Sequence, residues 1–308
     1  MSQLYDPERL LLSIAEDRHH GAEWLSNAAL GSMIALALNA TAGTADGLRE
    51  ALRSYARRMA ESRPSMTPIT NKLGMFYSRL PEGVPLNAFR AEATKQASLM
   101  IRESRKNKGR VVENARNVLG EPGTVFTVSD SSTVADVVLG VGAKNVVVTE
   151  SRPQMEGRNL AERMAGRGVN VMLVVDAAAA MFMESADVAV VGADSVLYDG
   201  GFVNKVGTRT AALAARDQDV PFYVVCSTYK FNVMNYLGRG VELEEKDPAE
   251  VAEIEGVEVR NPYFELVPGR LVTGIITERG VMEPLDIRVR MEEMRKQVEP
   301  LYRTTLRS

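Results

Sequence analysis

The second half of the chain alternates short β-branched runs with helical segments, and this alternation is the strongest constraint on its fold. A turn at Glu121-Pro122-Gly123 opens the pattern. Strands that alternate with helices predict an α/β fold, with a parallel sheet covered by helices on both faces. The expected strands cover 124–128, 145–149, 170–175, 188–191, 222–226 and 271–277, and the expected helices cover 132–139, 159–167, 208–216 and 286–298.

The first half shows helical spacing and no strand-like alternation of useful length. Asp6-Pro7 predicts a helix cap and first turn. The segment 63–71 holds two prolines and several hydroxyl groups, so it predicts a loop. The expected helices begin after Asp6-Pro7, run through Trp24–Met33, begin again at Thr44-Ala45-Asp46, and cover 88–105 and 111–119.

Length and composition fit two globular domains. At 308 residues the chain exceeds the usual size of one core, so we expect an N-terminal helical domain over 1–120 and a Rossmann-like parallel-sheet domain over 121–308.

The net charge of -3 gives no electrostatic footprint for nucleic acid, and the basic run 102–110 reads as a solvated helix end. The most apolar stretch, 28–42, is too short to span a bilayer. A single cysteine, Cys226, fits a reducing compartment, and we expect a cytoplasmic protein without membrane contact.

In a parallel sheet the ligand binds beyond the carboxyl ends of the strands, so the residues that end the strands are the candidate site. The first strand ends in the run 129–133 (SDSST), where free helix amides and hydroxyl groups favour a phosphate. A plain helix cap is the competing explanation. Arg152 and Arg158 follow the second strand, and their guanidinium groups suit phosphate oxygens. Ion pairs with Glu150 and Glu156 explain these arginines equally well.

The segment after the fourth strand is the most informative in the chain. That strand runs into Asp194, and a glycine-rich loop over 198–207 then carries Asn204 and Lys205. A carboxylate at a strand end, with glycines that allow close backbone approach and a lysine nearby, suits acid–base chemistry on a bound anion. The alternative is that Asp194 caps a turn and pairs with Lys205. Lys230, after the fifth strand, is a second candidate contact for phosphate.

Other kinds of site lack their residues in this sequence. Gly140-Val141-Gly142 follows an expected helix and lacks a third glycine, so it fails as a dinucleotide fingerprint. His19 and His20 are the only histidines, which leaves no His-rich metal site and no Ser-His-Asp triad. Cys226 lies in an apolar run and is expected to be buried and inert. We expect no metal and no cofactor.

Taken in order, these motifs resemble one family, which unites the regulatory α, β and δ subunits of translation initiation factor 2B with ribose-1,5-bisphosphate isomerase and methylthioribose-1-phosphate isomerase. The similarity runs along nearly the whole chain. Its most specific element is Gly192-Ala193-Asp194 followed by Asn204-Lys205 and Gly207-Thr208. The other matching segments are His20-Gly21-Ala22, Arg63-Pro64, Asn71, 129–134, 150–153, Gly157-Arg158, Asp176, Gly201, 229–231, Asn261-Pro262, Phe264, Pro268 and 273–280.

The resemblance implies roles for individual residues. The isomerases of the family use a cysteine just after the first strand and the aspartate of the Gly-Ala-Asp motif, and Ser129 and Asp194 stand at these positions. A serine hydroxyl is a far poorer proton donor or acceptor near neutral pH than a thiol. His20 stands where the isomerases have an arginine. The implied substrate- and phosphate-binding set is His20, Gly21, Ala22, Arg63, Ser131, Ser132, Arg152, Arg158, Asn204, Lys205 and Lys230.

Two functions therefore stay open. The first is an initiation factor 2B α-like protein that binds a phosphorylated sugar or nucleotide, with catalysis doubtful because Ser129 replaces the cysteine. The second is an aldose–ketose isomerase for a pentose 1-phosphate of the ribose 1,5-bisphosphate type, with Asp194 as general acid/base. Retention of Asn204 and Lys205 favours the second. The resemblance also implies a homodimer through the α/β domains, its assembly into a hexamer, and an initiation-factor partner.

Overall fold

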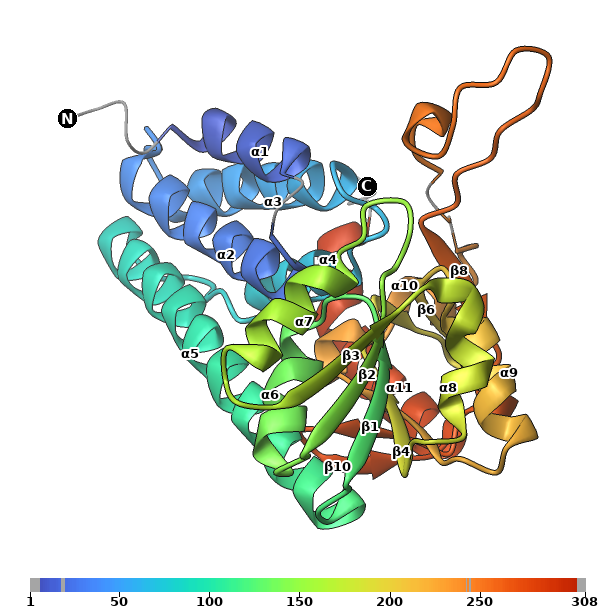
Figure 1. Ribbon diagram of the computed structural model, residues 1–308. Helices are drawn as coiled ribbons and strands as arrows, with labels where there is room; N and C mark the ends of the chain where they lie inside the picture. The colour runs from blue at the N-terminus through green and yellow to red at the C-terminus, as the bar shows by residue number, and fades with distance from the viewer. Residues whose placement is uncertain (1–5, 18–19, 242, 244, 304–308) are drawn as a thin grey trace. The chain divides into compact units, whose positions relative to one another are not determined.

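The structure is a computed structural model that describes residues 6–17, 20–241, 243 and 245–303 (Figure 1). The chain divides into two compact units. Unit 1 holds the described residues up to Lys106, the segment Phe231–Gly238 and the described residues from Val289 onward. Unit 2 holds Asn107–Lys230 and the described residues of Arg239–Arg288.

Unit 1 is helical, as the spacing of its apolar residues predicts. The expected caps form: the Asp6 side chain accepts from Glu8 N at 3.0 Å, and Thr44 Oγ1 accepts from Gly47 N at 3.1 Å. The helices are α1 (Pro7–Glu16), α2 (Ala22–Asn39), α3 (Ala45–Glu61), α4 (Thr67–Ser78), the first part of α5 (Leu86–Leu119), α10 (Val233–Tyr236) and most of α11 (Pro284–Tyr302).

Two expectations for the helical half are wrong. The predicted loop 63–71 ends early, because α4 begins at Thr67 and Pro68 occupies the first turn, where its missing N–H costs nothing. The basic run 102–110 is not a helix end, because α5 continues through it without a break. Its buried positions keep helical spacing across the run, at Ala93, Ala97, Met100, Ser104, Val111 and Ala115.

A buried ammonium group joins three helices of unit 1. Lys72 of α4 is only 1% exposed, although lysine is almost never fully buried without partners. Its Nζ donates to Ser26 Oγ at 2.9 Å, to Asn27 Oδ1 at 2.8 Å and to Ser104 Oγ at 2.9 Å. These acceptors lie on α2 and α5, so the polar cluster fixes how the three helices pack.

Unit 2 is built on a seven-stranded sheet in the order β10-β9-β7-β4-β1-β2-β3. All neighbouring strands are parallel except β10, which runs antiparallel to β9. The predicted α/β architecture with a mainly parallel sheet is confirmed. The strands are β1 (Thr124–Val128), β2 (Asn145–Thr149), β3 (Asn170–Val174), β4 (Val188–Val191), β7 (Phe222–Val225), β9 (Gly274–Thr277) and β10 (Gly280–Met282).

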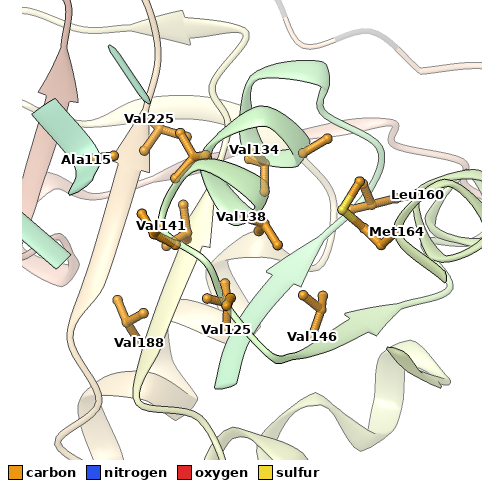
Figure 2. Close-up of a cluster of buried hydrophobic side chains, with 14 of the residues drawn as sticks. Ala115, Val125, Val134, Val138, Val141, Val146, Leu160, Met164, Val188 and Val225 are labelled. Carbon is orange, nitrogen blue, oxygen red and sulfur yellow. The ribbon is translucent and has the colours of Figure 1, made fainter. Parts of the chain in front are cut away.

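Both faces of this sheet are buried over its central strands, whereas the edge strand β3 exposes Met172 and Leu173. One face contributes Val125, Val146 and Val188 to a cluster that includes Val134 and Val138 of α6 (Figure 2). The opposite face is buried as well, at Phe126, Val147, Ala189 and Val224. The helices of unit 2 are the last part of α5, then α6 (Ser132–Gly140), α7 (Gly157–Ala165), α8 (Ala179–Met183) and α9 (Thr208–Asp217).

The sequence predicts a glycine-rich loop over 198–207, and this prediction is wrong for the second half of the segment. Phe202–Lys205 forms a strand, β6, in a small antiparallel sheet with β5 (Ser195–Val196) and β8 (Phe264–Val267). Only the turn between β5 and β6 is glycine-rich, with Gly200 at φ 82. Asn204 and Lys205 therefore lie on a strand, and the partner strand β8 is far along the chain, where local sequence gives no sign of it.

Within the described ranges, no helix is long and apolar enough to cross a bilayer.

Gly157 should be intolerant of any side chain. A Cβ at this position would lie 1.9 Å from the carbonyl oxygen of Thr149, a backbone atom that cannot swing away. We expect Gly157→Ala to lower the free energy of unfolding by about 3 kcal/mol, at the upper end of overpacking costs. The matched control is Gly109→Ala in α5, where a Cβ meets nothing within 4 Å, and it should stabilise by about 0.5–1 kcal/mol. Urea denaturation of both variants measures the difference, and equal effects would contradict the close approach at Gly157.

Candidate functional site at the carboxyl edge of the sheet

Polar residues gather at one edge of the large sheet. Strands β3, β2, β1, β4 and β7 run parallel, so their carboxyl ends lie at the same edge. The residues that follow these strands, in the same spatial order, are Asp176, Ser151, Ser129, Asp194 and Lys230. Unit 2 thus brings together the residues that the sequence places at strand ends.

The backbone is strained where β1 and β2 end. Ser129 has φ 66 and Ser151 has φ 63, in the left-handed region that costs a non-glycine residue about 1–2 kcal/mol. The two residues are tied together, because Ser129 N donates to Ser151 Oγ at 2.9 Å. Such strain persists where surrounding contacts over-determine the conformation, and it clusters at functional sites.

Asp176 holds this edge in place. Its Oδ1 accepts from Ser151 N at 2.8 Å and its Oδ2 accepts from Arg152 N at 2.7 Å. Both oxygens of the carboxylate therefore bind consecutive amides of the turn after β2. The sequence marks Asp176 as the end of the third strand, but this clamp is visible only once β3 is known to lie beside β2.

The helix-cap explanation holds for Ser131. It is the N-cap of α6, and its Oγ accepts from Val134 N at 3.4 Å. Gly192 makes room for it, since a Cβ at Gly192 would lie 2.9 Å from Ser131 Oγ. Ser132 is exposed in the first turn of the same helix. This turn can offer hydroxyl groups to an anion, but Ser131 already has a structural task.

The two arginines after β2 differ in their surroundings. The Arg158 guanidinium lies 3.6 Å from Glu150, which is the ion pair that the sequence offered as the competing explanation. Arg152 is exposed, and its Nη2 lies 3.5 Å from the carbonyl oxygen of Val251. Glu156 does not pair with either arginine in the bonds of the described residues. It pairs with Lys205 instead.

Lys205 is a nearly buried cation, with 5% of its side chain exposed. Its Nζ lies 2.9 Å from Glu156 Oε1 and 4.2 Å from the centre of the Tyr263 ring. The expected alternative, an ion pair between Lys205 and Asp194, does not form. The reason is the position of Lys205 on β6, which directs it to the start of α7 and to Tyr263.

Asp194 pairs with the other lysine. Its Oδ1 lies 3.4 Å from Lys230 Nζ, and the side chains are 37% and 16% exposed, respectively. The backbone N–H of Asp194 donates to Val203 O at 2.8 Å, which fixes the carboxylate beside β6. The edge therefore presents a solvent-accessible carboxylate next to an ammonium group.

The side chain of Asn204 is committed to the fold. Its Nδ2 donates to Thr208 Oγ1 at 3.0 Å, and Thr208 Oγ1 donates to the carbonyl oxygen of Lys205 at 2.6 Å. Glu265, which the sequence did not single out, caps the neighbouring helix α9. Its Oε1 accepts from Gly207 N at 2.6 Å and from Arg209 N at 3.0 Å. No local sequence signal predicts this cap, because Glu265 reaches the helix through the β6–β8 pairing.

Cys226 is buried, as predicted. It is 3% exposed, and burial raises the pKa of its thiol to about 12. The thiol therefore stays protonated at neutral pH and is a poor nucleophile or proton acceptor.

The site residues expected in the first half of the chain belong to unit 1. His20 and Arg63 both contact Asp17: His20 Nδ1 lies 2.7 Å from the carboxylate, and Arg63 Nη2 donates to the carbonyl oxygen at 2.6 Å. The His20 ring also stacks on Trp24 with ring centres 3.7 Å apart. Gly21 and Ala22 are the N-cap and first residue of α2. His19 lies outside the described residues.

Among the described residues, no group of three or more His, Cys, Asp or Glu side chains is arranged to hold a metal ion.

A helical unit and a mainly parallel sheet with polar strand ends define an α/β protein with a candidate site at the strand ends. The model of the initiation factor 2 subunit family matches residues 18–284. The chain therefore belongs to the initiation factor 2 subunit family, and the resemblance drawn from its motifs is confirmed.

Relatives in this family carry two kinds of name. The ribose 1,5-bisphosphate isomerase of Haloferax volcanii is 30% identical over 89% of this chain and 88% of that protein. The crystal structure of the translation initiation factor eIF-2B of Pyrococcus horikoshii has a TM-score of 0.78 at 29% identity, and covers 93% of this chain and 100% of that one. The 5-methylthioribose 1-phosphate isomerase of Pyrococcus horikoshii shares the fold, with a TM-score of 0.76 at 24% identity over 94% of this chain and 88% of that chain.

Loss of the Asp176 carboxylate should loosen the edge. In Asp176→Asn the amide NH2 group would face one of the two backbone N–H donors. One hydrogen bond is then lost, and two donors point at each other. We expect the free energy of unfolding to fall by about 1–3 kcal/mol in chemical denaturation. Asp217→Asn is the control, because Asp217 is exposed at the end of α9 and should change stability by less than about 0.5 kcal/mol. Equal stability of the two variants would show that the clamp contributes nothing.

Proposed function

We propose that this protein binds a phosphorylated sugar or nucleotide at the carboxyl edge of the large sheet, as an initiation factor 2B α-like protein with little isomerase activity. One observation carries the proposal: two lysine side chains, Lys205 and Lys230, are nearly buried at the strand ends, at 5% and 16% exposure. Ligands of parallel α/β sheets bind at this edge, and an ammonium group is a strong point charge for phosphate.

The proposed lack of efficient catalysis rests on Ser129. Its hydroxyl group has a pKa far above neutrality unless a base activates it. Among the hydrogen bonds of the described residues, none joins Ser129 Oγ to a carboxylate, a lysine or a histidine. Cys226, the only thiol, has a pKa raised to about 12 by burial. General acid–base catalysis from the Ser129 position is therefore weak on this proposal.

A second candidate function, sugar-phosphate isomerisation, is favoured by Asp194. In a pentose 1-phosphate the C1 oxygen carries the phosphate, so formation of the ketose breaks the ring bond between C1 and O4, moves one proton from C2 to C1 and passes the proton of the C2 hydroxyl to O4. A carboxylate that is 37% exposed can accept and return the carbon-bound proton. The ammonium of Lys230, 3.4 Å from Asp194, supplies positive charge where an enolate with its charge on the C2 oxygen would develop. Relatives named ribose 1,5-bisphosphate isomerase support this reading.

Binding can be separated from turnover with the purified full chain. We expect ribose 1,5-bisphosphate or AMP to raise the melting temperature, because a ligand at 100 times its Kd adds about 2.7 kcal/mol to the free energy of unfolding. Lys230→Met should reduce this shift. Lys144→Met, which removes an exposed lysine just before β2 at the amino edge of the same sheet, should not. If neither ligand shifts the melting temperature, both functions are wrong. If NMR detects ketose formation that Asp194→Asn abolishes, the protein is an isomerase.

Restoring the thiol tests the role of Ser129 directly. With ribose 1,5-bisphosphate as substrate, we expect Ser129→Cys to raise the rate of ketose formation by about 100-fold or more, within the range of general acid–base catalysis. Ser129→Ala is the matched control and should leave the low rate of the unmodified protein unchanged. A Ser129→Cys variant that binds the ligand but gains no activity would show that the missing thiol is not what limits catalysis.

A further inference from the structure

The ammonium group of Lys205 is poorly satisfied for a buried charge. It lies 2.9 Å from Glu156 Oε1, but Lys205 Nζ donates no hydrogen bond of acceptable geometry to any described residue. Glu156 Oε2 is also buried without a hydrogen-bond partner among the described residues. The pair thus has a charge contact and unused hydrogen-bonding capacity on both sides. Such capacity is costly to leave unmet in a protein interior.

One partner of Lys205 is firmly held. The Tyr263 hydroxyl donates to Glu250. Burial is the larger cause and this hydrogen bond the smaller cause of a raised pKa of Tyr263, so the phenol stays neutral. Glu250 is fixed in turn, because its oxygens accept from Asn261 Nδ2 at 3.0 Å and from Gln154 Nε2 at 3.3 Å. These bonds hold the Tyr263 ring, whose centre lies 4.2 Å from Lys205 Nζ.

The other partner, Glu156, is the one that can leave. Its side chain is 26% exposed, against 5% for Lys205, and it stands at the N-cap position of α7 without making a side-chain capping bond. Among the described residues, Lys205 is the one ion-pair or hydrogen-bond partner of its carboxylate. A rotation of its side chain toward solvent would uncover the ammonium group without moving β6.

We propose that Glu156 is an internal competitor for Lys205: it covers the ammonium group in the free protein, and the phosphate of the ligand displaces it. The inference rests on the proposed function, in which Lys205 contacts phosphate. A phosphate monoester carries about 1.5–2 negative charges and three acceptor oxygens near pH 7, against one charge and two oxygens for a carboxylate. The exchange therefore favours phosphate esters, and it selects against carboxylates and uncharged sugars.

Titration calorimetry on the full chain tests the exchange, with ribose 1,5-bisphosphate as the first probe and AMP as the second. We expect Glu156→Gln to bind the probe about 10-fold more tightly, since removing one ion-pair partner worth about 1.4 kcal/mol is a factor of ten in Kd. Lys205→Met should bind at least about 10-fold more weakly. Glu162→Gln is the charge-matched control: it removes an exposed carboxylate from the same helix, and its Kd should stay within about twofold.

The outcomes separate the exchange from the proposed function. Weaker or unchanged binding by Glu156→Gln, in a protein that otherwise binds the probe, overturns the competitor role and leaves the proposed function standing. No binding by the unmodified protein or any variant overturns both. If Glu156→Gln does not fold, Glu156→Asp keeps a counter-charge but withdraws it by one methylene. It should then tighten binding about two- to fourfold, and looser binding would count against the exchange.

Discussion

The carboxylate of Asp176, bound to the amides of Ser151 and Arg152, is the contact on which the rest of the strand-end edge depends. It fixes the turn after β2, and the Ser151 hydroxyl then holds the amide of Ser129 after β1. A chain of hydrogen bonds thus passes from the third strand to the first across the sheet. Because the bonds to Asp176 are charge-assisted, they are strong enough to offset the left-handed backbone at Ser129 and Ser151. The backbone at Ser129 is therefore held in place from two strands away.

The sequence predicts six of the seven strands of the large sheet, because each of these six carries its own signal, and it misses the antiparallel edge strand β10. The bounds of β1, β2 and β4 agree with the expected runs, since each is a short β-branched segment closed by turn residues. The misses occur where structure depends on distant partners. Strand β6 was read as a loop because two glycines precede it, and its pairing with β8 cannot be seen locally. Helix α5 was read as two helices because charged residues and Gly109 obscure a continuous buried stripe.

The candidate site was predictable as a set of residues, but not as a set of pairs. Strand-end position alone selects Ser129, Arg152, Asp194 and Lys230. Which charges meet depends on strand order, and β4 lies between β7 and β1. That order sets Asp194 beside Lys230, whereas Lys205 reaches Glu156 from a separate sheet. Crossover connections in a parallel sheet permit several strand orders, so a single sequence could not distinguish these pairings from the expected pair of Asp194 and Lys205.

This pairing explains how the edge can hold two lysines before any ligand arrives. An uncompensated buried charge costs about 3–5 kcal/mol, so an anion site with bare ammonium groups would destabilise the free protein. Here each ammonium has one carboxylate within 4 Å: Glu156 for Lys205 and Asp194 for Lys230. A bound phosphate must therefore replace or tolerate these carboxylates rather than fill an open positive site.

The two ion pairs, Glu156–Lys205 and Asp194–Lys230, also differ in kind. Glu156 has no chemical task in either proposed function, whereas Asp194 would keep Lys230 as a neighbour through a proton transfer. Binding and isomerisation can thus share one edge, and on this view the choice between them comes down to the side-chain atom at position 129, an oxygen in place of a sulfur.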